Sequence, residues 1–145
     1  MIKLIATDID GTLVKDGTLI IDPEYMTVIS KLIDKGIIFT VCSGRQFSSE
    51  QKLFAPIKDK LMYITDGGTV VRTPDRILKT YPMSNELWKD MCRMVRDELP
   101  ACDYFAASPD LCYAEDGASP IFHRLRDSYG FEMREIDDLT KLEND

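Results

Sequence analysis

The sequence lacks the long apolar runs and the positive charge on which several classes of protein depend. Its longest apolar run, residues 37–42, is far too short to cross a membrane, and Asp8 interrupts the N-terminal apolar run before it reaches signal-peptide length. The 18 basic residues are outnumbered by 25 acidic ones, which gives a net charge of −7. This balance argues against nucleic acid or an anionic membrane as a partner. We therefore expect a cytoplasmic protein that binds neither.

Cysteine and histidine are also scarce. The four cysteines (Cys42, Cys92, Cys102 and Cys112) form no C-x-x-C pair, so redox and zinc-finger functions have little support. A zinc site of Cys102, Cys112 and the lone His123 is an alternative. Free thiols packed in or near the core of a protein in a reducing cytosol are the more frequent state, and we expect that state here.

What the sequence does contain is an apolar strand pattern that ends in two carboxylates. The 145 residues are 44% hydrophobic and 30% charged, enough for one ordinary globular domain with a core. Residues 3–7 predict a buried strand, and Asp8, Asp10, Gly11 and Thr12 follow it. Two carboxylates two residues apart lean to the same side and favour a divalent cation between them. The alternative is a plain turn, in which Gly11 frees the backbone and the aspartates only begin the bend.

A helix and a second strand follow. Asp22 and Pro23 suit the N-cap and the first position of a helix, whose apolar residues recur at helical spacing until Gly36. Residues 37–42 then predict a second strand. Strand, helix and strand together predict a right-handed parallel βαβ unit.

Polar residues also stand at the ends of the second and third predicted strands. Ser43, Gly44 and Arg45 follow the second strand, and Asp66 follows a third strand over residues 61–65. Ligands bind beyond the carboxyl ends of the strands in open parallel sheets, so these residues share a rim with the two N-terminal aspartates. A hydroxyl and a free backbone N–H suit a phosphoryl oxygen there. The alternative is a helix N-cap at Ser43.

The rest of the chain alternates between short strand and helix patterns. An Asp-Gly turn predicts a hairpin over residues 14–21, and a second hairpin is predicted over residues 69–81. The remaining predictions are helices at 46–57, 84–99 and 119–129, and strands at 103–107, 111–115 and 131–136.

The DIDGTL stretch at residues 8–13 closely resembles the first motif of the haloacid dehalogenase superfamily of phosphohydrolases. Ser-Gly-Arg after the second strand resembles the second motif of the Cof-type, sugar-phosphatase-like branch. The resemblance implies an α/β fold, with the N-terminal part of a HAD-like (Rossmannoid) parallel-sheet core at residues 1–81. Residues 82–145 would be part of an α+β cap. The hairpin at residues 14–21 would be a flap beside the site.

The resemblance also implies roles for single residues. Asp8 would be the nucleophile that forms an aspartyl-phosphate, and Asp10 the general acid and base. Mg²⁺ would be held by the Asp8 carboxylate and the Asp10 carbonyl, and the substrate would be a small phosphorylated metabolite. Arg45 would pair with substrate phosphate or hold the rim through a carboxylate. The phosphate- and substrate-binding residues would be Gly11, Thr12, Ser43, Gly44, Arg45 and Asp66, although the branch usually has Asn in place of Asp66.

Two later motifs of the resembled family are not found, namely a lysine and a Gly-Asp-x-x-Asn-Asp run. We therefore expect an N-terminal part of a longer protein that is inactive or nearly so alone. An exposed core edge would favour self-association. The alternatives are a non-catalytic remnant that binds phosphate or metal and, less favoured, a receiver-like signalling module whose phospho-accepting residue would be Asp66.

Overall fold

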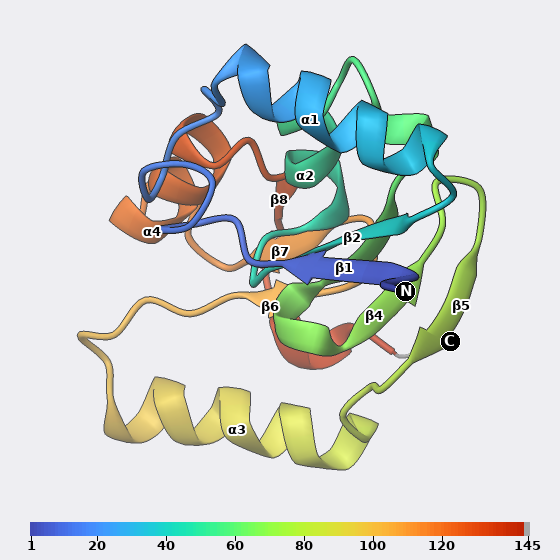
Figure 1. Ribbon diagram of the computed structural model, residues 1–145. Coiled ribbons are helices and arrows are strands. Elements are labelled where there is room, and N and C mark those ends of the chain that lie inside the picture. Colours follow the sequence, from blue (N-terminus) through green and yellow to red (C-terminus); the bar gives the residue numbers. More distant parts are fainter. Residues whose placement is uncertain (144–145) are drawn as a thin grey trace.

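The computed structural model describes residues 1–143 and contains two sheets (Figure 1). The larger sheet has five strands in the order β1-β2-β3-β4-β5. The first three strands are parallel, as predicted for the βαβ unit, and the last two are antiparallel. Their bounds are β1 Leu4–Thr7, β2 Ile38–Cys42, β3 Met62–Thr65, β4 Val70–Arg72 and β5 Ile77–Thr80.

Two helices cover one face of this sheet (Figure 1). Helix α1 (Pro23–Asp34) begins as predicted, because the Asp22 side chain accepts a hydrogen bond from the Glu24 amide at 2.9 Å. Helix α2 (Phe47–Leu53) is shorter than the predicted 46–57, since Pro56 disfavours helical backbone just before it. The five strands with α1 and α2 are called the five-stranded layer below.

The predicted hairpin at residues 14–21 does not form. The amides of Thr12, Leu13 and Val14 all donate to the Ile9 carbonyl, which folds the chain into a tight turn. Only an isolated bridge joins Asp10 and Val14, and no strand follows it before α1. The hairpin at 69–81 does form, as β4 and β5.

The second sheet has three strands in the order β6-β7-β8, with β7 antiparallel to β6 and parallel to β8. The predicted strand at 103–107 shrinks to two residues. The predicted helix at 119–129 is a single α-helical turn that continues as a π-helix over Arg124–Ser128. The bounds are α3 Asn85–Glu98, β6 Ala106–Ala107, β7 Cys112–Ala114, α4 Pro120–His123 and β8 Met133–Glu135. These elements are called the three-stranded layer.

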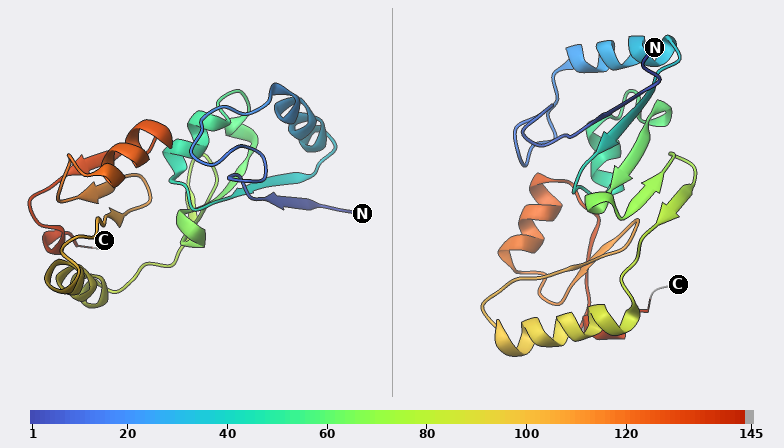
Figure 2. Two further views of the ribbon diagram at one scale, coloured as in Figure 1. Left: turned by 90° about the vertical axis from the view of Figure 1, so that its left-hand side faces the viewer. Right: turned by 60° about the horizontal axis from the view of Figure 1, so that its bottom comes forward.

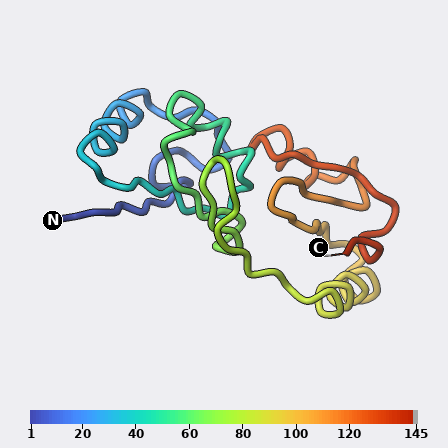
Figure 3. The backbone as a smooth tube through the Cα atoms, turned by 90° about the vertical axis from the view of Figure 1, so that its right-hand side faces the viewer, coloured from blue at the N-terminus to red at the C-terminus, as the bar shows by residue number. Residues whose placement is uncertain are grey.

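Polar contacts from α2 and the residue before it join the two layers, which lie side by side as two lobes (Figures 2 and 3). The Gln46 side chain accepts from the Glu132 amide at 2.7 Å, and Lys52 donates to the Gly130 carbonyl at 2.7 Å. Arg72 at the end of β4 forms a 2.6 Å ion pair with Asp110. These bonds place the three-stranded layer over the carboxyl ends of β1 and β2.

Strand β1 lies at the edge of its sheet, and among the described residues it pairs only with β2. Leu4 on this strand is 53% exposed. An unpaired strand edge with apolar side chains is a template for pairing with another strand. Self-association through this edge stays a prediction. None of the helices among the described residues is long and apolar enough to cross a membrane.

Candidate active site

The carboxyl ends of β1, β2 and β3 meet at one edge of the five-stranded sheet, as predicted. The Ser43 amide donates to the Ile64 carbonyl at 3.0 Å, which continues the β2–β3 ladder past the end of the strand. In return the Asp66 amide donates to the Arg45 carbonyl at 2.9 Å and the Gly67 amide to the Ser43 carbonyl at 3.1 Å. The Ser-Gly-Arg loop is therefore fixed by backbone hydrogen bonds before any ligand binds.

Asp8 is exposed at the end of β1, while Ile9 beside it is completely buried. The Thr12 hydroxyl donates to the Asp8 carboxylate at 3.2 Å. Gly11 has a φ of +78°, a backbone conformation that side chains disfavour, and it allows the turn that returns Thr12 to Asp8. Gly11 and Thr12 thus orient the candidate nucleophile.

Arg45 is buried, and two nitrogens on one edge of its guanidinium group bind the two carboxylate oxygens of Asp10. Nε donates to Asp10 Oδ2 at 2.8 Å and Nη2 to Asp10 Oδ1 at 2.7 Å, while Nη2 also reaches the Thr18 carbonyl at 2.8 Å. Of the two roles expected for Arg45, its side chain takes the second here, holding the rim through a carboxylate. The hydrogen bond from Arg45 lowers the pKa of Asp10, so Asp10 is held in its ionised form.

Asp66 does not line the cavity at this rim. It has a φ of +53°, a left-handed conformation that Asn and Asp tolerate better than most residues. Burial raises its pKa to about 6, although the hydrogen bond from the Thr65 hydroxyl at 2.6 Å opposes that shift. Its observed contribution is the backbone turn that binds the Ser-Gly-Arg loop.

Glu50 is a buried acid that the sequence analysis missed. It is completely buried on α2, and neither of its carboxylate oxygens has a hydrogen-bond partner among the described residues. Burial, followed by the negative charge of Asp66, raises the pKa of Glu50 well above its ordinary value. The sequence did contain a pattern that indicates burial of Glu50. It lies three residues after Phe47 and four before Phe54, and both are core residues on the same helical face.

A cavity of about 320 Å³ lies between the rim and the three-stranded layer. Its floor, from the five-stranded layer, is polar, and its roof, from the three-stranded layer, is apolar and aromatic. The floor consists of Asp8, Asp10, Asp16, Ser43, Gly44 and Arg45, and the roof of Phe105, Leu125, Tyr129 and Phe131.

Tyr129 is a second residue that the sequence analysis missed. Its ring centroid lies 5.0 Å from the Arg45 guanidinium carbon, and its hydroxyl donates to Asp16. Its carbonyl accepts a hydrogen bond from Ser49 on α2. The π-helix at Arg124–Ser128 immediately precedes it, and such helices are frequent at functional sites. No sequence pattern used above distinguishes a π-helix from an α-helix.

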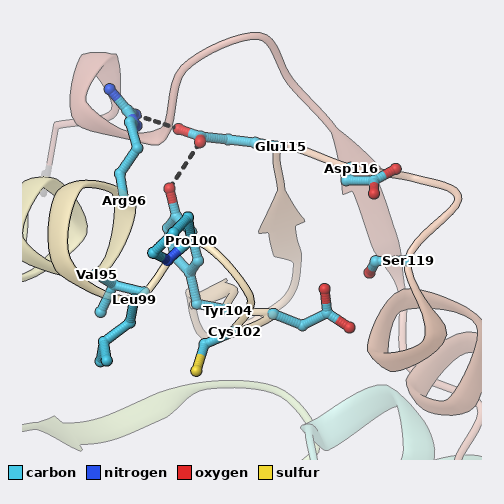
Figure 4. A pocket seen from close by; sticks show the side chains of 10 residues that line it. Val95, Arg96, Leu99, Pro100, Cys102, Tyr104, Glu115, Asp116 and Ser119 are labelled. Atoms are coloured by element: carbon cyan, nitrogen blue, oxygen red, sulfur yellow. Dashed lines mark hydrogen bonds and ion pairs between the residues drawn. The ribbon is translucent and has the colours of Figure 1, made fainter.

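A second cavity, of about 300 Å³, lies within the three-stranded layer (Figure 4). Its main polar groups are paired with one another, since Glu115 accepts from Arg96 at 2.6 Å and from the Tyr104 hydroxyl at 2.7 Å. Asp116 caps the local turn by accepting from the Ala118 amide at 2.8 Å. The cavity contains none of the residues predicted for the phosphate and magnesium site, although Cys102 of the alternative zinc site lines it.

The donor chemistry at the rim fits part of a magnesium site. Mg²⁺ prefers oxygen ligands and near-octahedral geometry, and Asp8 offers an exposed carboxylate beside the cavity. The Asp10 carboxylate is bound to Arg45, so only its main-chain carbonyl remains as a ligand. Among the described residues no cluster of three or more His, Cys, Asp or Glu could hold a metal, the alternative zinc site included. All four cysteines are free.

Comparison with protein families identifies the fold and the family. Residues 5–145 match the haloacid dehalogenase-like hydrolases. The chain belongs to this family. The match covers nearly the whole chain and includes the Asp8–Asp10 and Ser43–Arg45 motifs from which the resemblance was predicted.

Among curated proteins, the chain is 25% identical to the Escherichia coli 5-amino-6-(5-phospho-D-ribitylamino)uracil phosphatase YbjI, over 99% of this chain and 52% of that protein. The Bacillus subtilis phosphatase YwtE, named for the same substrate, is 32% identical over 60% of this chain and 30% of its own length. The chain thus spans about half, or less, of the length of these relatives. Both relatives are phosphatases by name.

Solved structures show the same fold. A crystal structure from Eubacterium rectale is 81% identical with a TM-score of 0.86, covering 99% of this chain and 54% of that one. The HAD subclass IIB sugar phosphatase BT4131 has a TM-score of 0.76 at 17% identity, over 97% of this chain and 55% of that one. The predicted HAD-like α/β fold is confirmed.

Proposed function

We propose that this chain carries the nucleophile and the phosphate-binding loop of a magnesium-dependent phosphomonoesterase that acts on small phosphorylated metabolites. The observation that carries the proposal is the cavity that Asp8, Ser43 and Gly44 line together. A carboxylate, a hydroxyl and a glycine backbone N–H meet there at the ends of adjacent parallel strands. The names of the curated relatives support a phosphorylated small molecule as substrate.

The proposed chemistry proceeds in two steps. An Asp8 oxygen attacks phosphorus, the bond between phosphorus and the ester oxygen breaks, and the leaving oxygen takes a proton from Asp10. Water then attacks the phosphorus of the aspartyl-phosphate while ionised Asp10 accepts its proton, and the bond between phosphorus and the Asp8 oxygen breaks, which releases inorganic phosphate and restores the Asp8 carboxylate. The Asp8 carboxylate and the Asp10 carbonyl would hold magnesium, which when bound screens the charge of the phosphate.

The ion pair between Asp10 and Arg45 affects both proposed steps, because Asp10 must give a proton in the first and accept one in the second. Because Arg45 holds Asp10 ionised, Asp10 has no proton to donate in the observed arrangement, and both of its oxygens already accept hydrogen bonds from Arg45. Donation in the first step requires Asp10 to gain a proton and to loosen its contact with Arg45. Accepting a proton in the second step also requires one Asp10 oxygen to leave Arg45.

A non-catalytic phosphate-binding remnant is the second candidate, and it is favoured by the small number of magnesium ligands. Among the described residues that line the cavity, the Asp10 carboxylate is bound to Arg45 and the Asp16 carboxylate to the Tyr129 hydroxyl, which leaves Asp8 and the Asp10 carbonyl as the main ligands. The net charge of −7 also opposes the approach of a dianion. We therefore expect the chain of 145 residues to turn over slowly or not at all by itself. The receiver-like alternative is less favoured, because Asp66 does not line the cavity.

The test is a phosphatase assay across a magnesium titration, on this chain and on a form extended to the length of the relatives. We expect magnesium-dependent turnover of an aryl phosphate in the extended form, reduced to background by Asp8→Asn, which keeps the shape and removes the attacking charge. Asp10→Asn should slow alkyl phosphates far more than aryl phosphates, whose leaving oxygen needs less protonation. Near-normal turnover in Asp8→Asn would exclude Asp8 as nucleophile.

A further inference from the structure

The floor and the roof of the cavity offer a ligand different chemistry. Every charged side chain that lines the cavity comes from the floor, namely Asp8, Asp10, Asp16 and Arg45. The roof contributes three aromatic rings and a leucine. A phosphate bound at the floor would therefore direct the rest of its ester toward an apolar surface.

Three of the four roof residues are occupied by contacts within the protein. Leu125 and Phe131 are buried and form a cluster with Cys112. Tyr129 lies over Arg45, and its hydroxyl is bound to Asp16. These residues shape the roof, but most of their surface is not available to a ligand.

Phe105 is the exception. It is 38% exposed, it precedes β6, and no aromatic or cation–π contact of its ring is found among the described residues. A single exposed Phe on a protein surface needs no explanation by itself. Phe105 differs because its exposed side chain lines the cavity that also holds the candidate nucleophile.

The Phe105 ring suits some groups attached to the ester oxygen better than others. A sugar or polyol hydroxyl placed directly against the Phe105 ring would find no hydrogen-bond partner on that ring, which costs free energy unless the hydroxyl turns toward water or the floor. A second phosphate would meet no free cation from residues 1–143 there, since Arg45 is the only basic residue among them that lines the cavity and it is bound to Asp10. A planar, uncharged group would lose little on leaving water and would gain contact with an aromatic ring.

We propose that Phe105 is a specificity-determining residue that selects phosphate monoesters carrying a planar, uncharged group close to the ester oxygen. This inference rests on the proposed function, because it takes the phosphate to lie at Asp8 and Ser43. It also sharpens that function, since it places the leaving group against the roof and names the side chain that contacts it.

The experiment measures binding of non-hydrolysable phosphonates to the chain of 145 residues by isothermal titration calorimetry with magnesium present. Benzylphosphonate is compared with cyclohexylmethylphosphonate, which is similar in size but not planar, and with methylphosphonate, which reaches only the floor. We expect benzylphosphonate to bind about three- to tenfold more tightly than the cyclohexyl compound. Phe105→Ala should remove this preference and leave methylphosphonate affinity unchanged.

Tyr81→Ala is the matched control, because Tyr81 is an exposed aromatic residue that does not line the cavity. It should keep the preference for the planar compound. Equal binding of the two ring compounds by the unaltered chain, or a preference that survives in Phe105→Ala, overturns the inference while the proposed function stands. Absence of methylphosphonate and inorganic phosphate binding would count against the proposed function itself, and the inference would fall with it.

Discussion

The two layers differ in how they are held together. In the five-stranded layer a continuous set of buried side chains, including Ile29, Phe54 and Tyr63, fills the space between the sheet and its two helices. In the described part of the three-stranded layer the buried cluster contains only Cys112, Leu125 and Phe131, and other buried residues such as Phe122 and Leu139 lie outside it. Apolar burial supplies most of the stability of a folded layer, so we expect the three-stranded layer to be the weaker one.

The candidate site residues of the cavity floor belong to the layer with the larger core, and those of the roof belong to the layer with the smaller one. Asp8, Ser43 and Arg45 stand at the ends of strands that the larger core fixes, whereas the roof is joined to the floor by polar contacts at Gln46 and Lys52. Layers with few buried contacts open locally at lower free energy than well-packed ones. The side chains of the floor are therefore expected to keep their positions when a ligand enters, and the roof is the part expected to move.

The largest expected effect comes from the larger core. Phe54 is completely buried, so Phe54→Ala should lower the free energy of unfolding by about 3–5 kcal/mol. Leu125→Ala should cost about 2–3 kcal/mol and act first on the three-stranded layer. The single tryptophan, Trp88 on α3, reports that layer by fluorescence in a urea titration, while circular dichroism reports both. Identical fluorescence and dichroism transitions in the unaltered chain and in Leu125→Ala would contradict the proposed difference between the layers.

The next largest effect on stability is expected at Glu50, because this buried carboxyl group has no hydrogen-bond partner among the described residues of the five-stranded layer. Its pKa is raised by burial, so the folded chain holds a proton that the unfolded chain releases above its ordinary pKa of 4.5. Stability should be unaffected by this group below pH 4.5 and should fall as the pH rises from there toward the folded pKa. Each unit of upward shift costs about 1.4 kcal/mol once the pH exceeds the folded pKa.

Glu50→Gln is the matched variant, since it keeps the shape of the side chain but does not titrate. We expect it to be more stable than the unaltered chain at pH 7 and to lose most of that advantage at pH 4. Urea titrations between pH 4 and pH 8 provide the measurement. Parallel stability profiles for the two proteins across this range would show that Glu50 is not buried as a protonated acid.

Much of the five-stranded layer could be predicted because its signals are local. An Asp-Pro helix start, a glycine stop and apolar strands of ordinary length predicted the βαβ unit, and polar residues at the strand ends predicted the rim. The flap hairpin was wrong: three amides converge on the Ile9 carbonyl and close a turn over residues 9–14, and no strand forms on either side of the Asp-Gly pair at residues 16–17. The competing turn was not visible in residue types alone.

The missed parts of the site depend on contacts between distant segments. Tyr129 meets Arg45 and Asp16 across more than eighty residues of sequence, and no local pattern predicts that meeting. The sequence left two roles open for Arg45, and only the position of Asp10 decides between them in the structure. Local sequence motifs therefore predict the residues of the cavity floor, whereas the residues of the roof come together only through tertiary packing.

A smaller effect on stability is expected at the ion pair between Asp10, after β1, and Arg45, after β2. Arg45→Lys keeps the positive charge but cannot bind both Asp10 oxygens in the same geometry, so it should lower the free energy of unfolding by about 1–2 kcal/mol at pH 7. The pKa of Asp10 is lowered in the folded chain, so this contribution is present above its ordinary value of 3.8 and is lost as the pH falls. Urea titrations at pH 7 and pH 3 check it. An equal deficit at both pH values would point to lost packing rather than the ion pair.

The smallest effect concerns the contact between the roof and the loop of residues 16–18. Tyr129→Phe removes the hydroxyl that donates to Asp16 but keeps the ring over Arg45. The bond is exposed, so its loss should cost only about 0.5–1 kcal/mol. Because the Gly17 amide donates to Asp10 at 3.4 Å, loosening of this loop should appear as faster hydrogen exchange at Gly17.

The control for this prediction is Tyr113→Phe, since Tyr113 lies on β7 and does not line the cavity. Hydrogen exchange at Gly17 should be unchanged in that variant and about two- to fivefold faster in Tyr129→Phe, which corresponds to the free energy of one exposed hydrogen bond. Amides of β2 and β3 should exchange at their original rates in both variants, because the core of the five-stranded layer holds them. Faster exchange throughout the five-stranded layer in Tyr129→Phe would mean that the roof stabilises the floor, and the two layers would then be one cooperative unit.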